Sequence, residues 1–269
     1  MMRILFFLIA GFFHYSLASA AGENLLFGIN EGVAAQGSPS EMQAKYQELS
    51  NVISQALKKE VRVEATQDLK SLVENLKKGR YDLIYARPSN LTAKALRDNN
   101  YVLVASAKNE LTVAFIVNKN ASMLKPEDML GKRFAMAEEK SLASKVGYAT
   151  LRDMGMDPAK QKIHYARLQE AVAFMVEKNF ADVGIIGNVG VKDWEKKGGR
   201  VLFKSKKFPS WAVIAPATTA PADIVKIRAA LVNLDTSEAG QKILAKTGIK
   251  GFTAGDPQEY VDFLKWIGA

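Results

Sequence analysis

Polar side chains that can bind a small ligand follow several apolar segments of this sequence. Asn30 and Glu31 come directly after the first such segment, and Arg87, Ser89 and Asn90 come after the third. Hydroxyl, amide and guanidinium groups donate hydrogen bonds, and a bond from arginine to an anion contributes about 1.5–3 kcal/mol. These residue types favour recognition of a ligand, with Arg87 as the contact to its negative charge.

The second half of the chain presents similar polar residues after its own apolar segments, and Trp211 lies where the chain is expected to return to its first half. Tyr46, on the first predicted helix, joins them. In open α/β sheets a ligand lies beyond the carboxyl ends of the strands, where these side chains are expected. The candidate ligand-binding residues are Asn30, Glu31, Tyr46, Arg87, Ser89, Asn90, Ser141, Ser144, Arg167, Gln169, Asn188 and Trp211.

Several of these residues have a structural alternative. Ser141 suits an N-cap, which stabilises a helix by about 1 kcal/mol without touching a ligand. Ser89 and Asn90 could cap a helix after Pro88. Arg87 could form a structural salt bridge. If it contacts the ligand instead, replacing it with alanine is expected to weaken binding at least about tenfold with little change in stability.

Catalysis is not expected. The chain has no cysteine and two histidines, of which His14 lies in a predicted leader. A Ser-His-Asp triad or a histidine-rich zinc site would therefore depend on the single His164. The sequence predicts a protein that is not an enzyme and that has no metal site and no cofactor.

Short apolar runs alternate with helical patterns and predict an α/β fold. Residues 25–30, 61–66, 81–86 and 101–106 are predicted strands. Between them, apolar residues recur with helical spacing, as at Met42, Tyr46, Leu49, Ile53 and Leu57. Strands separated by helices predict mainly parallel sheets with helices on both faces.

The strand pattern restarts near residue 111 and ends near residue 216, and the remaining tail is predicted to be purely helical. The tail helices bring no strand of their own, so they are expected to pack on a sheet that already exists. This order predicts one lobe from 22–108 with 209–269, a second lobe from 109–208, and two extended crossings that form a hinge.

The N-terminus has the features of a secretory signal. Arg3 precedes an unbroken apolar run over 4–13, and Ala18-Ser19-Ala20 provides the small residues of a cleavage site. The run is too short to span a bilayer. Residues 1–20 are therefore predicted to be a cleaved signal peptide, and the mature chain an exported protein.

The formal net charge is +9. The lysine pairs are scattered along the chain without interleaved aromatic residues, so the charge is interpreted as solvated surface and no nucleic-acid partner is expected. A positive field can still steer an anionic ligand toward a cleft.

Four segments together carry a resemblance to a known family: Lys45 to Leu49, Leu76 to Leu83, Leu130 to Ala135, and Ala239 to Phe252. In order and spacing the chain resembles the PhnD-like phosphate, phosphite and phosphonate-binding components of ABC transporters. These are type 2 periplasmic binding proteins, so the resemblance implies a two-lobed α/β fold, a periplasmic location and an inner-membrane permease as partner.

The family's ligand motif differs here. Its members typically have Ser-Thr-Ser-Gly where this chain has Ser141-Leu142-Ala143-Ser144, and Gln169 stands where a histidine is common. An acidic residue common near Asn188 is also missing. These differences leave the ligand open among a phosphonate or phosphate, another oxyanion such as a carboxylate or a sulfur oxyanion, and a small neutral amphiphile.

The sequence thus predicts a monomeric periplasmic binding protein that captures a small, anionic ligand between two lobes for an ABC permease. The alternative from another class is a ligand sensor, in which a membrane kinase or chemoreceptor detects the bound state.

Overall fold

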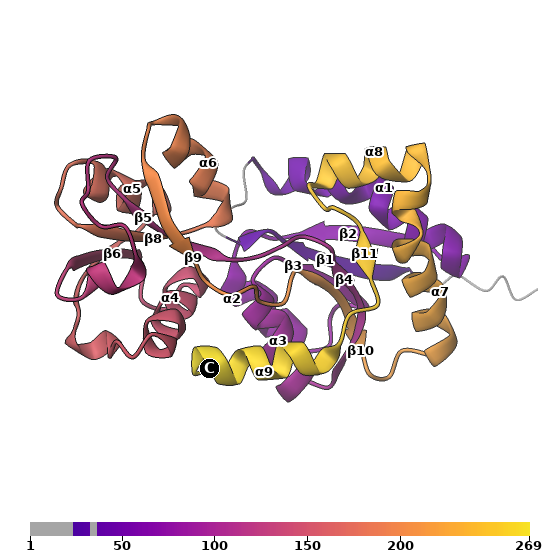
Figure 1. Cartoon of the computed structure of the whole chain (residues 1–269). Coiled ribbons are helices and arrows are strands. Elements are labelled where there is room, and N and C mark those ends of the chain that lie inside the picture. The colour runs from indigo at the N-terminus through magenta and orange to yellow at the C-terminus, as the bar shows by residue number, and fades with distance from the viewer. Residues whose placement is uncertain (1–23, 33–36) are drawn as a thin grey trace, which may run out of the picture.

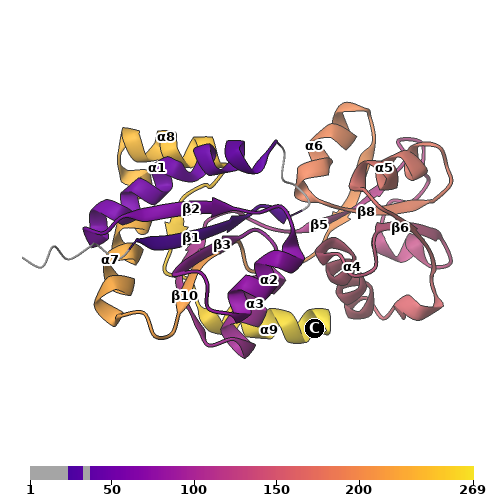
Figure 2. The same ribbon diagram turned by 180° about the vertical axis from the view of Figure 1, so that it is seen from behind.

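The computed structural model of the chain describes residues 24–32 and 37–269, and the predicted signal peptide at 1–20 lies outside these ranges. Within them the chain forms two β-sheets, each covered by helices, that lie side by side (Figure 1). Turning the molecule by 180° shows the same two bodies from behind (Figure 2). This is the α/β architecture with two lobes that the sequence predicts.

The first sheet has six strands in the order β11-β4-β10-β3-β1-β2. Its strands are β1 (Leu25–Asn30), β2 (Val61–Ala65), β3 (Leu83–Ala86), β4 (Tyr101–Ala107), β10 (Ala212–Pro216) and β11 (Phe252–Thr253). Strand β1 pairs in parallel with β2 and β3, whereas β10 runs antiparallel between β3 and β4. We call this sheet and the helices that pack on it lobe 1.

The second sheet has five strands in the order β7-β6-β8-β5-β9. Its strands are β5 (Val113–Val117), β6 (Arg133–Ala137), β7 (Lys162–Ala166), β8 (Val183–Gly187) and β9 (Arg200–Lys204). Strand β6 pairs in parallel with β7 and β8, and β5 runs antiparallel between β8 and β9. We call this sheet with its helices lobe 2.

Both sheets are mixed, so parallel pairs lie beside antiparallel ones in each. The parallel pairs are those that helical crossovers connect, such as β1 with β2 and β6 with β7. The antiparallel strands in the middle of the sheets are β5 and β10, which follow directly on the two crossings between the lobes. Apolar runs predict that a strand is buried but not its direction, so the sequence pattern could not separate the two cases.

The chain passes between the lobes twice, after β4 and before β10. The two crossings touch, since Leu111 forms an isolated antiparallel bridge with Phe208. The N–H of Ala107 donates to the carbonyl of Trp211 at 2.7 Å. These paired extended segments lie where the sequence predicts a hinge.

Helices cover both faces of each sheet. The helices are α1 (Pro39–Leu57), α2 (Leu69–Lys77), α3 (Ser89–Asp98), α4 (Leu142–Asp153), α5 (Gln169–Glu177), α6 (Asn188–Lys196), α7 (Pro221–Val232), α8 (Glu238–Thr247) and α9 (Pro257–Ile267). In α1 a capping box between Ser38 and Glu41 starts the helix, and the predicted apolar stripe from Met42 to Leu57 is buried. Residues of α1, α7 and α8 cover one face of the first sheet.

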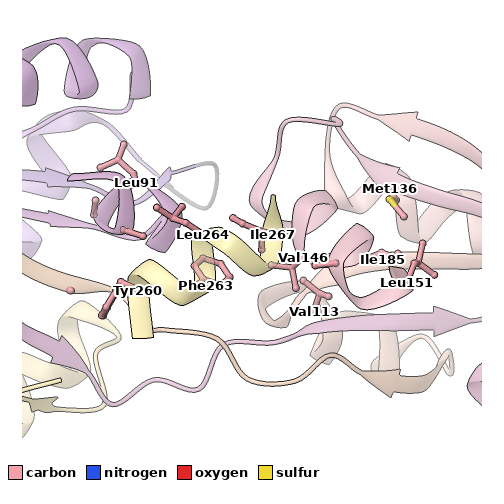
Figure 3. Packing of buried hydrophobic residues seen from close by; sticks show 14 of the residues in the cluster. Leu91, Val113, Met136, Val146, Leu151, Ile185, Tyr260, Phe263, Leu264 and Ile267 are labelled. Carbon is pink, nitrogen blue, oxygen red and sulfur yellow. The ribbon is translucent and has the colours of Figure 1, made fainter. Parts of the chain in front are cut away.

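The C-terminal helix α9 links the two lobes. It packs on α3 of lobe 1, and its far end lies against α4 of lobe 2 (Figure 1). One apolar cluster runs from Leu91 of α3 through Leu264 and Ile267 of α9 to Val146 of α4 (Figure 3). The Trp266 indole N–H also donates to Asp153 of α4 at 2.8 Å. Helix α9 is thus packed against both lobes beside the crossings.

The tail is not purely helical, since Phe252 and Thr253 form β11 on the edge of the first sheet, antiparallel to β4. Two residues carry no alternation of polar and apolar positions, so their pattern could not predict a strand. Within the described residues, no helix is long and apolar enough to cross a membrane.

Candidate functional site

Glu31 is the centre of a buried polar cluster at the end of β1. Its side chain is 4% exposed, and its Oε1 accepts hydrogen bonds from the Tyr46 hydroxyl at 2.6 Å and from Lys45 Nζ at 2.8 Å. A guanidinium nitrogen of Arg87 lies 2.8 Å from the same oxygen. Burial, together with the negative charge of Glu31, raises the pKa of Tyr46, so this hydroxyl stays protonated and donates.

Arg87, directly after β3, combines structural contacts with one free donor. Besides Glu31, its guanidinium donates to the carbonyl of Thr247 at 3.1 Å and lies 4.6 Å from the ring centre of Trp211. Its Nε is buried and has no hydrogen-bond partner among the described residues. The ion pair with Glu31 is the structural alternative recognised in the sequence, and the free N–H leaves Arg87 able to contact a ligand as well.

The first turn of α3 holds polar atoms that nothing in the described chain satisfies. Pro88 occupies the N-cap position and no side chain caps the helix. The N–H of Leu91 donates to the carbonyl of Pro88 at 2.8 Å, and the N–H groups of Ser89 and Asn90 have no partner within the helix. Ser89 and Thr92 are fully buried. The Ser89 Oγ, the Thr92 Oγ1 and the Asn90 Oδ1 are all buried without a hydrogen-bond partner.

Leaving a polar group buried and unpaired costs about 1–3 kcal/mol, so three such atoms in one helical turn need an explanation. An uncapped helix N-terminus with free hydroxyl donors is also a favourable place for an anion. The turn therefore has the donors and the positive end of the dipole that a bound oxyanion would use.

The serines at the start of α4 already have partners. Ser141 is the N-cap, and its Oγ accepts from the N–H of Ser144 at 3.2 Å. The Ser141 hydroxyl is 3.1 Å from the Ser144 Oγ, which in turn donates to the carbonyl of Ala137 at 2.9 Å. This chain of bonds is internal to the turn.

Three further candidates stabilise local structure. The Asn30 amide donates to the carbonyl of Thr66 at 2.7 Å, and its oxygen accepts from the N–H of Gly32. Gln169 Oε1 accepts from the N–H of Gly187 at 2.8 Å. Asn188 accepts from Thr112 and donates to the carbonyl of Glu110. Arg167 is exposed.

The structure thus brings Glu31, Tyr46, Arg87 and Trp211 into one cluster, with Ser89 and Asn90 directly after Arg87 in the chain. In lobe 2, Gln169 lies next to Gly187, the last residue of β8, and Asn188 is the residue that follows. The contact of these residues with a ligand stays a prediction. Two further positions, Thr92 and Lys45, were not predicted from the sequence. Thr92 lies one turn after Ser89, on the same face of α3, and that spacing could have indicated it. Lys45 precedes Tyr46 and could not be placed at Glu31 without the fold.

Two surface hollows lie away from this cluster. One, of about 550 Å³, is lined by α1 and by the edge strand β2, including Gln47, Asn51 and Arg62. The other, of about 470 Å³, is lined by Asn118, Lys132 and Asp182 at one end of lobe 2. No group of three or more His, Cys, Asp or Glu side chains in the described part of the chain is arranged to hold a metal ion.

Several solved structures are similar to this chain over most of its length. PhnD1 from Prochlorococcus marinus, in complex with methylphosphonate, has a TM-score of 0.68 at 15% identity over 90% of this chain and 96% of that one. XAC2383 from Xanthomonas citri, bound to ATP, has a TM-score of 0.71 at 15% identity over 91% and 96%. The periplasmic aliphatic sulphonate binding protein SsuA from Escherichia coli has a TM-score of 0.59 at 16% identity over 91% and 84%. These likenesses show the type 2 periplasmic binding protein fold.

The sequence over residues 32–260 matches the family model described as "ABC transporter, phosphonate, periplasmic substrate-binding protein". The match extends over most of the chain, in agreement with the resemblance found in the sequence. Members of this family are transport components and not enzymes. The chain belongs to the family of periplasmic substrate-binding proteins of phosphonate ABC transporters.

Proposed function

We propose that this protein captures a small tetrahedral oxyanion, of the phosphonate or sulfonate type, between its lobes, with the first turn of α3 as the main set of donors. The observation that carries the proposal is the pair of buried, unpartnered hydroxyls of Ser89 and Thr92 on one face of α3. An oxyanion bound there would satisfy hydroxyl and backbone donors and lie at the positive end of the helix dipole.

Two of the structural relatives described above support this chemistry. One holds methylphosphonate and the other is a binding protein for aliphatic sulphonates, and both ligands present oxygens around a tetrahedral centre. In this chain the hydroxyls of Ser141 and Ser144 are engaged with each other and with Ala137. We therefore expect lobe 1 to provide most of the hydrogen bonds, with the free Nε of Arg87 beside them.

The finer features of the transport role belong to the same proposal. Residues 22–108 with 209–269 form one lobe and 109–208 the other, and the two crossings act as the hinge on which they close. Residues 1–20 are a cleaved signal peptide, and the mature chain works as a monomer that presents its closed form to a membrane permease. A sensor role is not favoured, because the matching family consists of transporter components.

Thermal unfolding of the mature chain with a panel of ligands tests this proposal. Methylphosphonate, phosphate, methanesulfonate and acetate are added at equal ionic strength, with glycerol as a neutral control. A ligand at a hundredfold excess over its Kd stabilises the native state by about 2.7 kcal/mol, which raises the melting temperature by several degrees. We expect the tetrahedral oxyanions to raise it and acetate and glycerol to leave it unchanged.

The matched variant in this assay is Ser89→Ala. Removing a buried unpaired hydroxyl leaves the unliganded protein as stable or more stable, while loss of a ligand donor raises Kd about fivefold to tenfold. Thr150→Val is the control, because the Thr150 hydroxyl bonds to the carbonyl of Val146 within α4. If no oxyanion stabilises the wild-type chain, or if Ser89→Ala binds as well as wild type, the proposed site is wrong.

A further inference from the structure

Two lysines, one from each lobe, lie near the N-terminal ends of α3 and α4. Lys94 follows Asn90 by four residues on α3, and Lys145 follows Ser141 by four residues on α4. Residues four apart share a helix face, and helical side chains lean toward the N-terminus. We therefore expect each lysine to extend back over the first turn of its own helix, Lys94 toward Asn90 and Lys145 toward Ser141.

The packing of α3 and α4 on α9 places the two lysines next to a shared apolar cluster. Leu91 lies one turn before Lys94 and Leu142 one turn before Lys145, and both leucines pack on that cluster. Helix α9 contacts α3 and α4 in the same cluster, with Ile267 between Leu91 and Val146 (Figure 3). The two lysines thus come from the two lobes at the place where the lobes adjoin.

Within the described part of the chain neither lysine is paired at hydrogen-bond distance, although the charge of Lys94, after that of Arg97, helps to lower the pKa of the Asp98 carboxyl one turn further along α3. Across residues 24–32 and 37–269, Lys94 and Lys145 make no ion pair or hydrogen bond, unlike Lys45, which is bound to Glu31. Partial burial of Lys145, and then the positive charges of Lys94 and Lys140, lower the pKa of the Lys145 ammonium. Lys94 therefore acts on Lys145 across the two lobes as a like charge.

We propose that Lys94 and Lys145 form a cationic clamp that holds the oxyanion from both lobes and makes closure depend on the charge of the ligand. The proposal rests on the oxyanion-binding function proposed above. Without ligand the two ammonium groups repel and favour separation of the lobes. A bound oxyanion between them replaces this repulsion with two attractions, and a dianion does so more strongly than a monoanion. The clamp thus favours phosphonate or phosphate over sulfonate.

Methylphosphonate and methanesulfonate are the probes, because they have nearly the same shape and differ in charge. At about pH 8.5 most of the phosphonate is a dianion, whereas the sulfonate remains a monoanion. Coulomb energy is proportional to charge, so the logarithm of the loss in affinity should be about twice as large for the dianion. We expect Lys94→Met and Lys145→Met each to raise Kd roughly tenfold for methylphosphonate and about threefold for methanesulfonate.

Lys242→Met is the matched control, since Lys242 is exposed on α8 and pairs with Glu238 at 2.7 Å. It should change neither Kd by more than about twofold. Equal losses of affinity for the two probes would mean that the lysines do not distinguish the charge of the ligand. Unchanged Kd values in both lysine variants would overturn the clamp but not the oxyanion site. If the wild-type chain binds neither probe, the proposed function fails, and the clamp fails with it.

A charge reversal tests the contact between lobes without any ligand. In Lys145→Glu, the new carboxylate should attract Lys94, so the unliganded protein is expected to have a smaller radius of gyration by X-ray scattering. The double variant Lys94→Glu with Lys145→Glu restores like charges and should return the radius to the wild-type value. An unchanged radius in the single variant would show that the two side chains do not meet across the lobes.

Discussion

At the scale of single residues, Arg87 shows how a candidate can be both structural and functional. From the sequence, a ligand contact and a structural salt bridge were alternative roles for Arg87. The structure gives Arg87 an ion pair with Glu31, a contact with Trp211 and a bond to Thr247, and it leaves the Nε without a partner. The salt bridge does not exclude the ligand contact, because the two use different nitrogens.

The buried ion pair changes what is expected of a substitution at Arg87. Removing one partner of a buried ion pair costs about 3–5 kcal/mol. The loss should be smaller here because Lys45 and Tyr46 still donate to Glu31. We therefore expect Arg87→Met to lower the free energy of unfolding by about 2–3 kcal/mol. Kd for the oxyanion should rise roughly tenfold. Urea unfolding and calorimetric titration measure the two effects.

Adding Glu31→Gln separates these effects. The double variant removes the uncompensated carboxylate, so it should recover part of the lost stability while the affinity stays low. Wild-type stability in Arg87→Met would show that the ion pair contributes nothing. Wild-type affinity would remove Arg87 from the ligand site.

At the scale of elements, an aspartate carboxylate accepts a hydrogen bond from a backbone N–H where the first and third strands of each lobe begin to pair. In lobe 1 the Asp82 carboxylate accepts from the N–H of Leu26 at 2.7 Å, just before β1 and β3 pair. In lobe 2 the Asp182 carboxylate accepts from the N–H of Arg133 at 2.8 Å, just before β6 and β8 pair. Arg133 also donates two side-chain bonds to Asp182. An aspartate before the third strand of each unit thus fixes its alignment with the first.

The Arg133 guanidinium and N–H hold the pKa of Asp182 below its ordinary value. Since the pKa in the folded protein is lower than in the unfolded chain, the pair stabilises the fold above about pH 4, and this stabilisation is lost as pH falls through the folded pKa. Asp182→Asn should lower the free energy of unfolding by about 1 kcal/mol at pH 7, because solvent screens a partly exposed pair.

Denaturant unfolding at several pH values checks this prediction. The difference between Asp182→Asn and wild type should shrink as the pH falls below about 4, whereas Asp193→Asn, on the exposed face of α6, should match wild type throughout. A difference that stays constant down to pH 2 would assign the loss to packing and not to the charge of Asp182.

The sequence predicted elements better than the site. The apolar stripe of α1 is buried as expected, because helical spacing reports directly on burial. The direction of β10 and the short β11 depend on where distant segments meet, which periodicity does not encode. The side chains of Ser141, Gln169 and Asn188 already have hydrogen-bond partners within the protein. Several of these partners are distant in the chain, so the residue types alone could not predict the bonds.

At the scale of the whole molecule, the arrangement suits a protein that closes on a ligand. Two sheets are joined by two extended crossings that touch at Leu111 and Phe208, and helix α9 contacts both lobes beside them. Stacking of Phe208 on Phe263, with ring centres 5.2 Å apart, ties the second crossing to α9. A ligand bound between the lobes would therefore act on both at once, which the transport role of the family requires.

The location of the bound oxyanion is the central claim, and hydrogen exchange of the mature chain measures it directly. The exchange is followed with and without the oxyanion that gives the largest thermal shift. We predict that the ligand slows exchange together in the segments 87–94 of lobe 1 and 141–146 of lobe 2. Protection confined to 39–65, around the hollow between α1 and β2, or to one lobe alone, would contradict the account.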